Sequence, residues 1–133
     1  MATTFQNLEE NIVHKNWIMT ADEMWRRTKQ FAIDCGHLVL SLEVNAVNRA
    51  YGGQLIRSSS SVGANYRATR RAKSTSDFIN KFKIVEEEMD ESLFFLEMIA
   101  EFNKDKRDKI AILYKEGEEI LKIIVASLKT LRK

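Results

Sequence analysis

The densest chemistry in this chain is a cluster of basic residues that follows a serine-rich segment. The segment QLIRSSSSVGANYRATRRAKS covers residues 54–74, and two further lysines follow shortly after it. Guanidinium and ammonium groups pair with phosphate oxygens, so such a cluster could bind a polyanion. We predict that a nucleic-acid-binding corner is formed by six residues: Arg67, Arg70, Arg71, Lys73, Lys81 and Lys83.

The same six charges also have a purely structural explanation. Cations near the end of a helix complement its dipole and keep the surface soluble. The formal net charge of +2 permits a polyanionic partner without requiring one. A symmetric oligomer would array identical corners into a broad basic surface, and this favours nucleic acid. The alternative is a protein-interaction scaffold whose corner recruits an acidic protein.

A block of acids lies directly downstream, from residue 86 to residue 91. Like charges one helical turn apart weaken an isolated helix, so a cationic neighbour would relieve them. Arg57 is the candidate for that neighbour, and Asn65, two turns further along, could bond another carboxylate or a backbone group. We predict a structural polar network of Arg57, Asn65, Glu88 and Glu91, and the alternative is a plain solvated face.

Catalytic and metal chemistry have little support in the sequence. A di-iron bundle needs two Glu-x-x-His motifs, but the chain has only His14 and His37, and neither accompanies the acidic block. The four serines at 58–61 have no histidine or lysine base nearby in the sequence, so close helix packing explains them better. We therefore expect no enzymatic activity, no metal, no cofactor and no small-molecule substrate.

Helical elements must position these residues, because the chain has no proline and only five glycines. Periodic apolar residues predict a first helix over Ala21–Leu42, with Thr20 and Glu23 as a capping box. The pair Gly52 and Gly53 predicts a stop, with a second helix beginning near Gln54. A third helix, capped by Ser74 with Asp77 or by Ser76, is predicted to end near Phe102, and a fourth runs almost to the C-terminus.

One face of each predicted helix carries the residues expected in the core. The second helix is unusual, because its stripe is small and polar and would let neighbouring backbones approach closely. The stripes are Met24, Thr28, Phe31, Cys35, Leu38 and Leu42; Leu55, Ser59, Val62, Tyr66 and Thr69, with Gly63 alongside; Phe78, Phe82, Val85, Met89, Leu93, Leu96 and Ile99 or Ala100; and Ile110, Leu113, Gly117, Ile120, Ile124, Ser127 or Leu128, and Leu131.

The predicted fold class is all-α: an up-and-down antiparallel four-helix bundle with a short N-terminal extension. At 133 residues the chain is the size of one domain. We predict an N-terminal arm or short helix over 1–19 and the bundle over 20–133. A second apolar stripe formed by Phe95, Met98 and Phe102, with Trp25 on the first helix, favours self-association. Alternatively, these residues cap the bundle ends or lie under the arm.

Cysteine content and hydropathy bear on the compartment. Cys35 is the only cysteine, so no disulfide can form within the chain and a reducing compartment fits best. Its place on the apolar stripe indicates a buried thiol. No window reaches the roughly 18 apolar residues expected of a membrane span. We predict a cytoplasmic protein without a membrane partner.

Several of these motifs together resemble a known family. The segments QLIRSSSSVGANYRA, RRAKS and DFINKFKIVEEEMDESLFFLEMI closely resemble bacterial four-helix-bundle proteins encoded in 23S ribosomal RNA intervening sequences. The resemblance spans about residues 31–102, and Phe94-Phe95 stands where relatives often carry Tyr-Trp. It implies a homopentamer of four-helix protomers. It also implies a relationship to the accessory variability determinant of diversity-generating retroelements, a pentameric basic barrel that binds nucleic acid and a reverse transcriptase.

The residues and the resemblance together lead to one functional hypothesis. We predict a non-enzymatic homo-oligomer, with a pentamer implied by the resemblance, that binds RNA through the basic corner. Ribosomal RNA is one candidate ligand. The family has no well-established biochemical activity, so the resemblance adds no catalytic residues.

Overall fold

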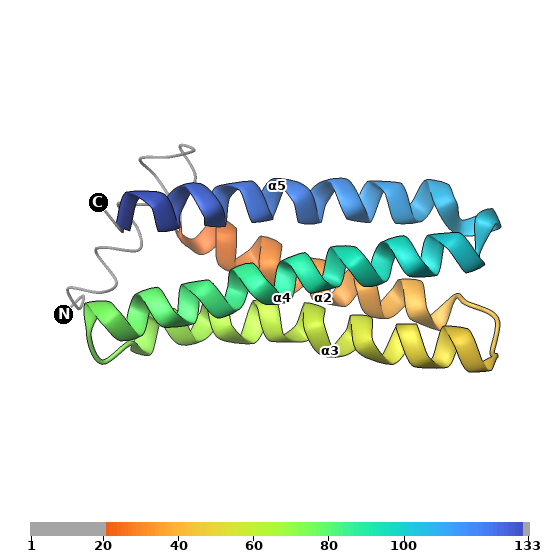
Figure 1. Cartoon of the computed structure of the whole chain (residues 1–133), viewed down its shortest axis with the longest axis horizontal. Coiled ribbons are helices and arrows are strands. Elements are labelled where there is room, and N and C mark those ends of the chain that lie inside the picture. Colours follow the sequence, from red (N-terminus) through yellow and green to blue (C-terminus); the bar gives the residue numbers. More distant parts are fainter. Residues whose placement is uncertain (1–20, 132–133) are drawn as a thin grey trace.

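The computed structural model describes residues 21–131, which form four long helices packed side by side (Figure 1). The helices are α2 (Ala21–Leu40), α3 (Ala46–Ala68), α4 (Thr75–Phe102) and α5 (Arg107–Leu131). Short 3-10 turns, η1 (Thr69–Arg71) and η2 (Lys104–Lys106), precede α4 and α5. The prediction of an all-α up-and-down bundle is confirmed. The predicted arm over 1–19, and Thr20 of the predicted capping box, lie outside the described residues.

The apolar stripes predicted from the sequence form the core. Met24, Leu55, Val62 and Ile124 are fully buried, as are most other members of the four stripes. The helices are long enough for this core to extend through the bundle, since 28 residues of α4 span about 40 Å. The aromatic rings of Phe78 and Phe82 stack within it at a centroid distance of 5.5 Å.

The helices do not pack equally closely. Among the four pairs of neighbouring helices, contacts are most extensive between α3 and α4 and least extensive between α2 and α5. The α2–α3 contact is close at Gly63, where a β-carbon would lie 3.5 Å from the carbonyl oxygen of Thr28 and 3.7 Å from the α-carbon of Lys29. The predicted close approach of backbones along the small face of α3 is therefore confirmed.

The predicted start of the second helix was wrong. Helix α3 begins eight residues earlier, at Ala46, because the side chain of Asn45 accepts a hydrogen bond from the backbone N–H of Asn48 at 2.8 Å and caps it. Gly52 and Gly53 lie inside this helix rather than at its end. A β-carbon at Gly52 would come within 2.9 Å of Val39, so this glycine allows close packing against α2.

The start of α4 follows the sequence prediction. The hydroxyl of Ser74 accepts a hydrogen bond from the backbone N–H of Asp77 at 3.0 Å. The carboxylate of Asp77 in turn accepts a hydrogen bond from the backbone N–H of Lys73 at 2.9 Å. This reciprocal capping fixes the turn between η1 and α4, which carries part of the basic cluster.

The up-and-down order places four chain segments at one end of the bundle. The start of α2, the end of α3, the start of α4 and the end of α5 meet there (Figure 1). We call this the basic end, because it holds the six basic residues singled out in the sequence. The opposite end holds η2 and the connection between α2 and α3. None of the described helices is both long and apolar enough to cross a membrane.

Candidate nucleic-acid interface

The structure brings the six basic residues to the basic end, where they divide into two groups. Arg67, Arg71, Lys73 and Lys83 are exposed. Within residues 21–131, no ion pair joins any of these four side chains to a carboxylate. Among the described residues, these four cations are thus exposed and have no carboxylate partner.

Arg70 is held more firmly. Its guanidinium donates a hydrogen bond to the carboxylate of Asp22 at 3.0 Å and lies 4.4 Å from the centroid of the Trp25 ring. Only 20% of the Arg70 side chain is exposed. Arg67 also lies over Trp25, at 5.4 Å, but remains exposed. Arg70 thus anchors the end of α3 to the start of α2, and cation–π contacts hold the indole in place.

Lys81 is also paired. Its ammonium lies 2.8 Å from a carboxylate oxygen of Asp77, one helical turn away on α4. The hydrogen bond from Lys81, together with that from the backbone N–H of Lys73, holds the pKa of Asp77 below its usual value. Asp77 therefore stays ionised and serves both as a helix-capping group and as the partner of Lys81.

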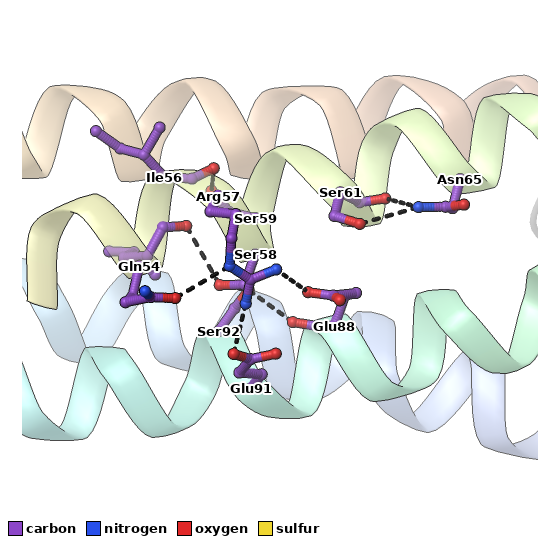
Figure 2. A network of polar contacts seen from close by, with 11 residues as sticks. Gln54, Ile56, Arg57, Ser58, Ser59, Ser61, Asn65, Glu88, Glu91 and Ser92 are labelled. Carbon is purple, nitrogen blue, oxygen red and sulfur yellow. Dashed lines mark hydrogen bonds and ion pairs between the residues drawn. The ribbon is translucent and has the colours of Figure 1, made fainter.

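Arg57 bridges two of the predicted carboxylates (Figure 2). Its guanidinium donates to Glu88 at 3.1 Å and to Glu91 at 2.5 Å, and its Nε donates to the side chain of Gln54 at 3.0 Å. The hydrogen bond to Glu91 is the main reason that the pKa of Arg57 is raised. This cluster joins α3 to α4, with Gln54 as a member that sequence reasoning missed.

Asn65 lies apart from this cluster. Its amide donates hydrogen bonds of 2.9 Å to the backbone carbonyl and to the hydroxyl of Ser61, one turn earlier on the same helix (Figure 2). The predicted contact with a backbone group is therefore local, and no hydrogen bond joins Asn65 to Glu88 or Glu91 among the described residues.

The serine-rich segment packs against α4. Ser58 and Ser92 are fully buried, and their hydroxyl oxygens lie 2.8 Å apart. The Ser92 oxygen also lies 2.8 Å from the backbone carbonyl of Glu88, and that of Ser58 lies 3.3 Å from the carbonyl of Leu55. The two hydroxyls are thus used in helix packing, which agrees with the structural interpretation of the serines.

Two further polar clusters were missed in the sequence. Arg27 on α2 donates to Glu116 on α5 at 3.0 Å through Nε and lies 3.1 Å from Glu119. The amides of Asn48 and Asn103 bond each other at 2.7 and 3.0 Å in a buried position. Helical periodicity on two facing helices is the only sequence signal that could have indicated the Arg27 cluster. No sequence signal indicated the Asn48–Asn103 pair.

The opposite end of the bundle also carries cations, but these alternate with acids. Lys104, Lys106, Arg107 and Lys109 lie in a stretch that also contains Asp105 and Asp108, and Arg107 lies 3.7 Å from Glu101. The field of closely alternating opposite charges falls off quickly with distance. Both ends of the bundle therefore contain several basic residues, and those at the opposite end have acids next to them in the chain.

Catalytic and metal-binding groups are sparse in the described part of the chain. No cluster of three or more His, Cys, Asp or Glu side chains among residues 21–131 could hold a metal ion. Cys35 is completely buried, and this burial raises the pKa of its thiol to about 12. The thiol is therefore a packing group, as its position on the apolar stripe predicted.

The fold and surface define the class: an antiparallel four-helix bundle protein with a group of exposed cations at the end where α3 is followed by α4. The chain belongs to the 23S rRNA-intervening sequence protein family, whose model matches residues 21–126. A crystal structure of a protein of unknown function from the S23 ribosomal protein family of Bacteroides thetaiotaomicron is similar, with a TM-score of 0.73 and 28% identity. The alignment covers 84% of this chain and 99% of that one. No curated protein matches the chain.

Proposed function

We propose that this protein is a non-enzymatic RNA-binding protein that acts as a homo-oligomer in the cytoplasm. The observation that carries the proposal is the group of four exposed cations at the basic end: Arg67, Arg71, Lys73 and Lys83. The family description refers to 23S ribosomal RNA, so ribosomal RNA is the first ligand to test. Binding of this kind depends on phosphate charge and is weakly specific for sequence.

Self-association would increase the number of cations that one RNA molecule can contact, because each copy of the chain carries its own four. Phe94 and Phe102 on α4 are 51% and 55% exposed, and Ile112 on α5 is 75% exposed. Phe102 and Phe95 also contact Tyr51, at centroid distances of 6.0 and 6.3 Å, so part of the second apolar stripe serves the bundle itself. The remaining exposed apolar surface supports an oligomer, and the family resemblance implies a pentamer.

Neutralisation of two corner cations tests the proposal. We expect Arg71→Gln with Lys73→Gln to weaken binding to a 23S ribosomal RNA fragment about tenfold at moderate salt, because each lost phosphate contact reduces affinity. Fluorescence anisotropy with labelled RNA measures this. The matched control is Lys104→Gln with Lys109→Gln, which removes the same charge from the opposite end and should change affinity less than threefold.

Two results would count against the proposal. Equal losses in the corner variant and in the control variant would mean that net charge, rather than the basic end, governs binding. Absence of RNA binding by the wild-type protein, together with recovery of one acidic protein after nuclease treatment, would favour the scaffold alternative.

A further inference from the structure

A shallow groove of about 230 Å³ runs between α2 and α3 and reaches the basic end. Trp25, Lys29 and Ile33 of α2 line one side, and Gly63, Ala64 and Arg67 of α3 line the other. The groove exists because α3 presents small residues here while the α2 side chains extend past them. It is smaller than the roughly 300–1,000 Å³ of pockets that enclose a whole drug-sized ligand, so it suits one part of a longer molecule.

The charge of this groove is distinctive. Lys29 and Arg67 contribute cations, and no carboxylate is among its lining residues. The grooves between α2 and α5 and between α4 and α5 are lined by carboxylates as well as cations: Asp34 with Lys109; Asp34, Glu116 and Glu119 with Lys115; and Glu97 and Glu118 with Arg107 and Lys115. An anionic ligand is therefore favoured more in the α2–α3 groove than in these other grooves, where carboxylates offset the cations.

The same groove offers surfaces that suit a planar ring. The ion pair with Asp22 holds Arg70, and Arg70 lies against Trp25 at 4.4 Å, so the indole is fixed from within the fold. Arg67 lies over the same indole at 5.4 Å and is exposed. A guanidinium plane in this position can stack on a nucleobase, and Ile33, two helical turns beyond Trp25 on α2, adds apolar surface to the same groove.

We propose that the α2–α3 groove binds one unpaired nucleotide of the RNA. The base stacks on Arg67 and contacts the indole edge and the small residues of α3, while its phosphate pairs with Lys29 or Arg67. A base inside a duplex is covered by its neighbours and cannot enter. This inference rests on the proposed RNA binding and adds a preference for single-stranded or loop nucleotides, which exposed cations alone would not give.

The variant Ala64→Leu tests the groove without changing charge. Ala64 is exposed on α3, so a leucine there fills the groove and leaves the core intact. The matched control is Ala50→Leu, an exposed alanine on the same helix outside the groove. The probes are a ten-nucleotide single strand and a ten-base-pair duplex of RNA. We expect the wild-type protein to bind the single strand at least fivefold more tightly per phosphate than the duplex.

We expect Ala64→Leu to weaken single-strand binding about fivefold to tenfold, as loss of one base-stacking contact would, and to change duplex binding less than twofold. Ala50→Leu should change neither. A second readout is the fluorescence of Trp25. The chain has two tryptophans, so the substitution Trp17→Phe is made first, which leaves Trp25 as the only source of indole fluorescence. We expect the single strand to quench this fluorescence and Ala64→Leu to abolish the quenching.

Other outcomes separate this inference from the proposed function. RNA binding that is sensitive to Arg71→Gln with Lys73→Gln but unaffected by Ala64→Leu would overturn the groove and retain the basic end. Failure of the wild-type protein to bind any RNA would overturn both. Dissociation of the oligomer by Ala64→Leu would contradict the inference, because it would mean that a second copy of the chain covers the groove.

Discussion

At the scale of single residues, a cation's neighbours decide what it can do. Arg70 and Arg71 are adjacent in the sequence, yet Arg70 is paired with Asp22 whereas Arg71 is exposed. The sequence could identify both as members of a basic cluster. It could not reveal the Asp22 contact, because that carboxylate lies 48 residues away on another helix. The Lys81–Asp77 pair, by contrast, follows from spacing along one helix.

The predicted bridge from Arg57 to the acidic block shows when longer-range pairs can be predicted. Helices α3 and α4 are antiparallel neighbours joined by a short turn, so residues equally far from the turn must face each other. The Asn48–Asn103 pair joins positions 55 residues apart at the far end of the same two helices. Its prediction would have required the true start of α3, which the glycine pair obscured.

The buried thiol gives a test at the residue scale. Because the pKa of Cys35 is about 12, little thiolate exists at pH 8, and we expect alkylation in the folded protein to be at least a hundredfold slower than in urea. Mass spectrometry of iodoacetamide-treated protein measures this. A raised pKa favours the protonated thiol in the fold, so this contribution to stability is full below about pH 9 and declines as pH rises toward 12. Rapid labelling of the folded protein would contradict the burial.

At the scale of elements, the glycines inside the helices differ in how closely neighbouring side chains pack against them. Gly117 lies where α5 meets α2 and α4, and a β-carbon there would come within 2.8 Å of Leu93 and 3.0 Å of Phe31. Gly53 has no neighbouring atom within 4 Å of the corresponding position. Sequence reasoning placed Gly117 on the core stripe correctly but treated Gly53 as a helix stop, because a glycine's surroundings are not encoded in its immediate neighbours.

These two glycines make a matched pair for measuring stability. We expect Gly117→Ala to lower the free energy of unfolding by about 1–3 kcal/mol, since the added methyl group overpacks the core. Gly53→Ala should raise it by about 0.5–1 kcal/mol, because alanine is the better residue inside an exposed helix. Urea denaturation followed by circular dichroism measures both. Stabilisation by Gly117→Ala would show that the α5 contact is looser than described.

At the scale of the whole molecule, helix order determines where charge collects. An up-and-down bundle places the α3–α4 turn beside the start of α2 (Figure 1), and the exposed cations Arg67, Arg71, Lys73 and Lys83 lie in or near this turn. Periodicity was sufficient to predict this architecture, because each helix carries one apolar stripe of helical spacing. Periodicity alone does not predict an assembly of several bundles, since exposed apolar residues can serve the bundle ends as well as an interface.

Sedimentation velocity tests the proposed assembly. We expect the purified protein to sediment as one species of about five times the mass of a single chain, and we expect Phe94→Ser to shift it toward smaller species, because Phe94 is exposed and contributes little to the core. Ala50→Leu serves as a surface control. A protein that remains a monomer at high concentration would contradict the proposal that an oligomer brings several basic ends together.

The salt dependence of RNA affinity tests the central claim most directly. Four exposed cations at the basic end predict that log affinity falls with log salt concentration with a slope of about −3 or steeper. Arg71→Gln with Lys73→Gln should make the slope shallower by about 2, whereas Lys104→Gln with Lys109→Gln should leave it unchanged. A wild-type slope near zero, or an identical slope in the corner variant, would contradict the assignment of RNA binding to the basic end.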